Sequence, residues 1–144
     1  MEKITVLDKF RKAHESDYET ALEEIRNGRK RSCWMWYIFP QSGGLGTSIM
    51  SEHFAIKDIE EARMFYEDAY LGKNLVEICN VLLDLKTDDA EEVFGFPDCL
   101  KLKSSMTLFS IACPEEKVFQ AVLDKYCKGE KDLKTIRVLE DNIV

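Results

Sequence analysis

Hydrophobic residues recur along most of the chain at steps of three and four, the period of an amphipathic helix. The clearest example lies in residues 70–87, where Leu71, Leu75, Ile78, Leu82 and Leu85 follow one another at steps of four, three, four and three. Strand-like alternation with period two is hard to find. The pattern therefore predicts an all-α fold of about seven helices with short connections.

Capping residues place several helix ends. Ser16 with Glu19, and Asp58 with Glu61, form the spacing of a capping box. Pro114 suits the first turn of a helix, and glycines suit the exits. The expected helices cover residues 6–14, 16–28, 58–68, 70–87, 88–95, 113–129 and 132–141, with an apolar helix starting near the hydroxyl residues of 101–110.

The composition is that of an ordinary globular protein, with 45% hydrophobic and 33% charged residues among 144. Without repeats or a linker rich in Pro and Gly, the sequence predicts a single domain over residues 1–144. The chain has no apolar run of ~18 residues and its start does not resemble a secretory signal, so we expect a cytoplasmic protein without membrane association. Five widely spaced cysteines and two histidines indicate free thiols, no metal site and no cofactor.

The net charge of −7 argues against general nucleic-acid binding, which depends on many Lys and Arg residues. Basic residues are nevertheless concentrated in "RNGRKR", residues 26–31. Such a local cationic patch suits a small anion better than a polymer. A solvated helix exit explains the same run, and both interpretations stay open.

The stretch "GRKRSCWMWYIFPQSGGLG", residues 28–46, combines this basic run with both tryptophans and a glycine-rich turn. Cationic side chains bind phosphate or carboxylate, and indole faces stack on flat rings. The alternative is that the aromatic residues belong to the core, as we expect for Met35, Ile38 and Phe39. The candidate ligand-binding residues here are Arg29, Lys30, Arg31, Ser32, Trp34, Trp36 and Gln41.

A second candidate stretch is "KLKSSMTLFS", residues 101–110. Its residues Lys101, Lys103, Ser104 and Ser105 precede an apolar segment, and hydroxyls with free amides at a helix N-terminus can bind an anion. A plain N-cap with two surface lysines is the alternative. If the two stretches form one pocket, they would bind a small anionic, nucleotide-like ligand, with or without processing it.

A third candidate is Glu52, which follows the glycine-rich turn together with His53. A carboxylate in this position could act as a general acid or base beside the pocket. The alternative is an exposed acidic residue on a short helix.

Several of these motifs together resemble a known bacterial family. The segments "GRKRSCWMWYIFPQSGGLGTSIMS", "FGFPDCLKLKSSMTLF" and "VLDKYCKGEKDLKTI" are similar to the family catalogued as domain of unknown function 1810 (DUF1810), some members of which carry the label calpastatin. The resemblance covers nearly the whole chain. It implies a compact, mainly helical cytosolic domain and no established activity. The family usually has a histidine where this chain has Cys33.

A fainter resemblance concerns a tryptophan, the "SEHF" that comes later and the helix with an aromatic pair that follows. It is similar to the motif of N-glycosidases that cleave ADP-ribose-type linkages, and it implies Glu52 as the catalytic carboxylate. Three hypotheses thus remain: a binder of a small anionic ligand, a protein-interaction module whose aromatic residues are core, and an N-glycosidase. The sequence names no protein partner.

Overall fold

The computed structural model describes residues 5–141 and forms nine helices and no strand over this range. They are α1 (Asp8–Arg26), α2 (Met35–Ile38), α3 (Ile49–His53), α4 (Ile59–Glu67), α5 (Leu71–Asp84), α6 (Ala90–Phe94), α7 (Asp98–Ala112), α8 (Val118–Tyr126) and α9 (Leu133–Asp141). The predicted all-α fold is confirmed. The helices outnumber the expected seven partly because of α2, where the pattern predicted no helix, and α3, the short helix with an exposed Glu52 that was the alternative interpretation of this residue. No helix within residues 5–141 is long and apolar enough to cross a membrane.

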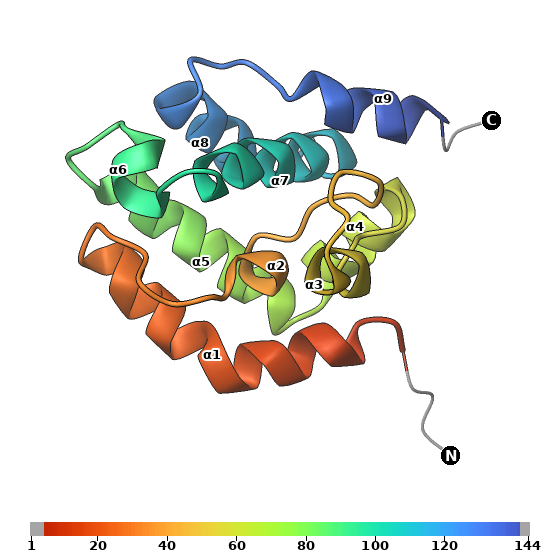
Figure 1. Cartoon of the computed structure of the whole chain (residues 1–144). Helices are drawn as coiled ribbons and strands as arrows, with labels where there is room; N and C mark the ends of the chain where they lie inside the picture. The colour runs from red at the N-terminus through yellow and green to blue at the C-terminus, as the bar shows by residue number, and fades with distance from the viewer. Residues whose placement is uncertain (1–4, 142–144) are drawn as a thin grey trace.

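Helix α7 lies at the centre of the molecule (Figure 1) and contacts α4, α6, α8 and α9. Residues 104–109 of this helix are all buried, so it shows no apolar stripe. The sequence placed its start after the lysines, but α7 begins at Asp98. Consequently Ser104 and Ser105 lie inside the helix, and the expected anion site at a helix N-terminus does not form there.

Helix α1 replaces the two helices expected over residues 6–14 and 16–28. The predicted capping box at Ser16 is wrong: its hydroxyl lies in the middle of the helix and donates to the Asp17 carboxylate at 3.0 Å. Buried side chains from Phe10 to Ile25 continue on both sides of Ser16. Extending a helix costs less than starting a second one, so the apolar stripe overrides the local capping signal.

Other predicted helix ends are confirmed. The Asp58 side chain accepts a hydrogen bond from the Glu61 amide at the start of α4, and Gly95 ends α6 with φ +76°. Pro114, in contrast, lies in a turn four residues before α8, which begins at Val118. The prediction that Pro114 occupies the first helical turn is therefore wrong.

Two contacts fix α5 against its neighbours. A Cβ atom on Gly72 would lie 1.8 Å from the Tyr66 carbonyl oxygen, so only glycine permits this close approach to α4. At the other end of α5, the Lys125 ammonium of α8 donates to the carbonyl oxygens of Leu82 at 3.0 Å and Leu83 at 2.9 Å, and also to that of Leu85. The last carbonyls of a helix lack partners in a following turn, and Lys125 supplies donors to them; the Leu82 carbonyl also accepts from the Tyr126 hydroxyl at 2.6 Å.

The segment between α2 and α4 places the candidate site. Met35, Ile38 and Phe39 are buried as expected. The chain then forms a loop over residues 40–48, which is held to residue 56 by backbone hydrogen bonds of 2.8 Å and 2.9 Å. This loop and α3 lie close to α7 and α4 (Figure 1).

A buried histidine links α1, α2 and α5. The His14 side chain is 1% exposed, with Nε2 2.8 Å from the Tyr37 carbonyl oxygen and Nδ1 3.1 Å from the Asn74 amide nitrogen. Because a carbonyl only accepts, Nε2 carries the proton and Nδ1 accepts from Asn74. Burial, which outweighs the Tyr37 hydrogen bond, lowers the His14 pKa to about 4.

Candidate functional site

The Glu24 carboxylate on α1 organises the basic stretch that follows this helix. It accepts hydrogen bonds from the Arg31 amide at 2.7 Å, from the Ser32 amide and hydroxyl at 2.9 Å and 2.6 Å, and from the Trp34 indole at 2.9 Å. Burial alone would raise the Glu24 pKa, but these hydrogen bonds prevail and lower it to about 2. The Ser32 hydroxyl and the Trp34 N–H are therefore already used within the protein.

Trp34 belongs to the core, as the alternative interpretation held. It is 1% exposed and packs against Phe39 and Phe94. Lys30 lies 5.2 Å from the Trp34 ring centroid, and its ammonium is 2.9 Å from the Asp98 carboxylate of α7. Lys30 thus joins the basic stretch to α7 through a structural ion pair.

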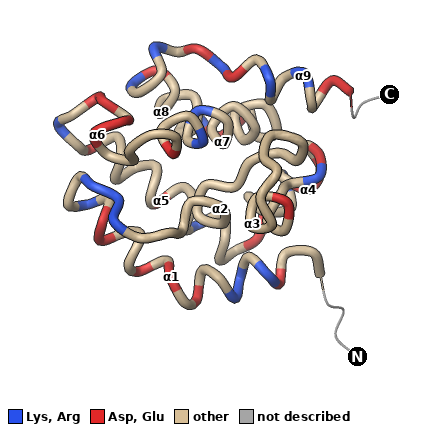
Figure 2. The backbone as a smooth tube through the Cα atoms, in the orientation of Figure 1, with Lys and Arg blue, Asp and Glu red and all other residues tan. Residues whose placement is uncertain are grey.

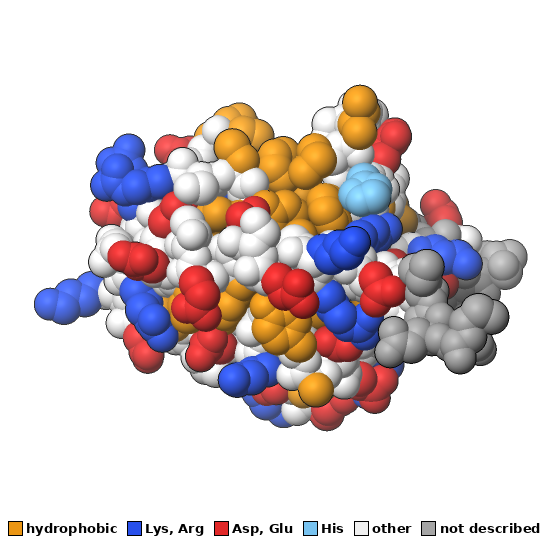
Figure 3. Space-filling view, turned by 90° about the horizontal axis from the view of Figure 1, so that it is seen from below, with side chains coloured by type: hydrophobic (Ala, Val, Ile, Leu, Met, Phe, Trp, Pro, Cys, Tyr) orange, Lys and Arg blue, Asp and Glu red, His pale blue; other side chains and the backbone are white. Residues whose placement is uncertain are grey.

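The charged groups are unevenly arranged (Figure 2). The basic run after α1 lies beside α6, where the Lys30 amide donates to the Val93 carbonyl at 2.7 Å. Arg29 and Arg31 are exposed there. On the face that carries α1, acidic and basic side chains are mixed (Figure 3). Neither region therefore offers a cavity with a dominant positive charge.

A groove of about 1010 Å³ lies between α7, the loop of residues 40–48 and the connection from α8 to α9. Gln41 of the first candidate stretch and Lys101, Lys103 and Ser104 of the second line the same groove. The two stretches therefore meet, as the hypothesis requires. Its other lining residues include Leu45, Pro97, Leu100, Glu130, Lys131, Asp132, Leu133, Lys134 and Ile136.

Seven of the predicted ligand-binding residues do not line this groove, and one of them, Trp36, lines a smaller cavity beside it. The structure places Arg29 and Arg31 on the exposed exit of α1, engages Ser32 with Glu24, and buries Trp34. Lys30 is paired with Asp98. Ser105 is fully buried, and its hydroxyl has no hydrogen-bond partner among the described residues.

Two lysines of the groove form ion pairs with carboxylates. The Lys101 ammonium is 3.3 Å from Asp98 and 5.6 Å from the Trp36 ring centroid. Lys103 lies 3.7 Å from Glu130, whose side chain is 73% exposed. An ion pair with such an exposed carboxylate contributes little free energy. An incoming anion can therefore replace Glu130 at small cost, whereas Asp98 is largely buried and also holds Lys30.

Asp132 is the second carboxylate of the groove, and it already accepts hydrogen bonds within the protein. It accepts from the Thr135 amide at 3.0 Å, from the Thr135 hydroxyl at 2.6 Å and from the Ser104 hydroxyl at 3.3 Å. These bonds cap the start of α9 and attach it to α7. Asp132 thus has a structural role in the wall of the groove.

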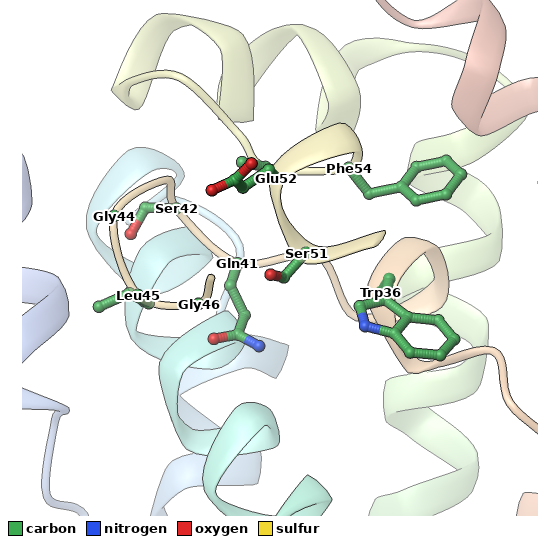
Figure 4. A pocket seen from close by; sticks show the side chains of 10 residues that line it. Trp36, Gln41, Ser42, Gly44, Leu45, Gly46, Ser51, Glu52 and Phe54 are labelled. Atoms are coloured by element: carbon green, nitrogen blue, oxygen red, sulfur yellow. The ribbon is translucent and has the colours of Figure 1, made fainter. Parts of the chain in front are cut away.

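A smaller pocket of about 140 Å³ adjoins the groove (Figure 4). It is lined by Trp36, Gln41, Ser42, Gly44, Leu45, Gly46, Ser51, Glu52, Phe54 and Ala55. Glu52 contributes its one titratable side chain. The partner that the sequence suggested for it, His53, is not among the lining residues; its ring lies 4.7 Å from that of Phe54.

Several residues of the two cavities were not predicted from the sequence. Ser42 and Ser51 lie in the glycine-rich loop and on α3, and Lys131 and Lys134 come from the start of α9. No local pattern distinguishes these residues from surface positions; the packing of α9 against α7 brings the two lysines to the site, and the fold of the loop and α3 brings the two serines. Within residues 5–141, no group of three or more His, Cys, Asp or Glu side chains is placed to hold a metal ion.

Comparison with known proteins gives two matches, one to a solved structure and one to a family model. The crystal structure of the conserved hypothetical protein Rv1873 from Mycobacterium tuberculosis is similar to this chain, with a TM-score of 0.91 and 40% sequence identity over 93% of this chain and 96% of that one. No curated protein matches the chain. The model of the family described as "Protein of unknown function (DUF1810)" matches residues 5–139. The chain therefore belongs to the DUF1810 family.

Proposed function

We propose that the groove between α7, the loop of residues 40–48 and the start of α9 binds a small anionic ligand. The observation that carries this proposal is the common wall formed by Gln41 and by Lys101, Lys103 and Ser104. These residues come from two stretches that are 60 positions apart in the sequence.

The charge of the groove supports an anion. Four lysines line it, on a chain with a net charge of −7. Of the two carboxylates, Asp132 is engaged by Thr135, and Glu130 is largely in water. The Lys134 ammonium has no hydrogen bond or ion pair with the described part of the chain. The ammonium groups thus exceed the carboxylates that could neutralise them, which favours a ligand of opposite charge.

The remaining surface supports a ligand that also has an apolar or flat part. Leu45, Leu100 and Ile136 line the groove beside the lysines. The partly exposed Trp36 lies in the adjoining pocket, with Lys101 over its ring. Binding sites for small molecules commonly combine an apolar lining with a few polar groups. A nucleotide-derived compound has both properties.

A thermal-shift and calorimetry experiment with AMP, ADP-ribose and inorganic pyrophosphate tests the proposal. A ligand at 100 times its dissociation constant should stabilise the protein by about 2.7 kcal/mol. Lys103→Met should weaken binding by about tenfold or more, the effect of losing one charged hydrogen bond. Lys12→Met, on the exposed side of α1, is the matched control and should bind as the wild type does. Absence of binding by all three probes would contradict the proposal.

The second candidate function is a protein-interaction module. Leu100 and Leu133, which line the groove, are 54% and 70% exposed, and the neighbouring Phe96 is 71% exposed. Exposed apolar side chains of this size can mark an interface. Leu133→Glu would then abolish association with a protein partner, whereas Lys103→Met would leave it intact. Cleavage of an N-ribosyl bond by Glu52 stays a prediction of the sequence.

A further inference from the structure

The small pocket contains a buried hydroxyl without a hydrogen bond. Ser42 is 3% exposed, and its Oγ has no partner among residues 5–141. Its backbone is held in place, since the neighbouring Gln41 carbonyl and Gly43 amide bond to residue 56. Buried polar side chains in native proteins nearly always have a partner, in the protein, in ordered water or in a ligand. The Ser42 hydroxyl is therefore available to a polar group bound in this pocket.

Other polar side chains around the pocket also keep their hydrogen-bonding capacity. The Glu52 carboxylate, the Gln41 amide and the Trp36 indole N–H make no hydrogen bond within the described part of the chain. In Figure 4 the Glu52 carboxylate extends toward the side where Ser42 lies, and the indole nitrogen of Trp36 faces Gln41. The pocket thus presents one negative acceptor together with several neutral donors and acceptors.

This set of groups selects the chemistry of the occupant. A carboxylate accepts hydrogen bonds from hydroxyl groups, as acidic residues do with the ribose of nucleotides. A phosphate would be repelled by Glu52. A volume of about 140 Å³ holds about four or five water molecules at ~30 Å³ each, or one hydroxylated ring. The pocket therefore suits the neutral, hydroxyl-rich part of a ligand.

The pocket and the groove are continuous. Gln41, Leu45, Gly46 and Ser51 line both of them. A Cβ atom on Gly46 would lie 2.6 Å from the Ser51 hydroxyl oxygen, so the glycine allows the loop to approach α3 at this shared wall. One ligand can therefore place a hydroxylated ring beside Glu52 and Ser42 while its anionic group lies among the lysines.

We propose that the ligand is a sugar phosphate or a compound that contains one, with its sugar hydroxyls on Glu52 and Ser42 and its phosphate on Lys101 and Lys103. This inference rests on the proposed function of the groove and adds the identity of the ligand class. It assigns Glu52 a binding role that requires no chemical step.

The test compares D-ribose 5-phosphate with 2-deoxy-D-ribose 5-phosphate by calorimetry. The wild-type protein should bind the deoxy sugar about tenfold more weakly, because one hydroxyl bound to the carboxylate is lost. Glu52→Gln should reduce the affinity for ribose 5-phosphate by about tenfold and remove most of this preference. Lys103→Met should weaken the binding of both sugar phosphates to the same extent.

Ser42→Ala gives an independent measurement. Because it removes a buried hydroxyl that has no partner in the protein, it should not lower the melting temperature, yet it should weaken ribose 5-phosphate binding several-fold. Ser16→Ala, on the exposed middle of α1, is the matched control. A lower melting temperature with unchanged affinity would show that Ser42 holds only an ordered water.

The outcomes separate the two proposals. If anionic probes bind in a manner that depends on Lys103, while Glu52→Gln and Ser42→Ala leave sugar phosphate binding unchanged, the sugar assignment is overturned and the anion groove stands. If neither sugar phosphate binds, and none of the nucleotide and pyrophosphate probes binds, the proposed function is refuted. The inference about the sugar is then refuted as well.

Discussion

Acidification below about pH 6.5 should destabilise this protein through His14. The imidazole is buried and neutral, with its single proton on the nitrogen that faces the Tyr37 carbonyl. Protonation of Nδ1 would direct a second N–H at the Asn74 amide nitrogen, which is itself a donor there. The folded protein therefore resists the proton that the unfolded chain readily takes up.

The magnitude follows from the pKa values. Burial lowers the pKa of His14 from 6.5 to about 4 in the folded state. Below about pH 6.5 the unfolded state binds more protons, so the stability contributed by neutral His14 is complete above this pH and is lost as the pH falls toward about 4. At ~1.36 kcal/mol per pH unit, the loss amounts to about 3 kcal/mol.

Urea unfolding at several pH values between about 7 and about 4 measures this loss. His14→Gln is the comparison, because glutamine can donate to Tyr37 and accept from Asn74 without titrating. The free energy of unfolding of the wild type should fall by about 3 kcal/mol more than that of the variant across this range. Carboxylates such as Glu24 titrate in both proteins and cancel in the difference. Parallel pH curves for the two proteins would refute the reasoning.

Two further substitutions test the local structure. Glu24→Ala should lower the free energy of unfolding by about 2 to 3 kcal/mol, because the buried N–H of Trp34 loses its acceptor. Denaturant unfolding followed by tryptophan fluorescence measures this loss, and a value below about 0.5 kcal/mol would contradict the prediction. Gly72→Ala should lower the free energy of unfolding by more than about 2 kcal/mol, since the new Cβ would overlap a backbone carbonyl of α4. Calorimetric melting measures this effect, with Ser16→Ala as control. An unchanged melting temperature would show that the close approach does not exist.

Helices that are marked by a local sequence pattern are predicted well. Helix α5 is recognised by its stripe of leucines, and α4 by the capping residue Asp58. The start of α7 was missed for a physical reason. A central helix with neighbours on several sides has no polar face to mark its period, so its lysines and serines were taken for a cap.

The candidate site was predictable to the level of segments. Gln41 and Lys101 were expected in one pocket and line one groove. Individual residues were harder, because neighbouring positions on a helix point about 100° apart. Ser104 faces the groove while Ser105 is buried. Lys134 was missed because its place at the site depends on how α9 packs against α7, and the sequence around Lys134 does not indicate this packing.

The position of Lys125 also has a chemical consequence. Its ammonium lies among three carbonyl oxygens at the end of α5, which it reaches from α8. Acylation requires an accessible amine, and the Lys125 nitrogen is engaged by these three acceptors. Acetylation of Lys125 would therefore follow local opening of the fold, and the modification would then prevent α5 and α8 from closing again.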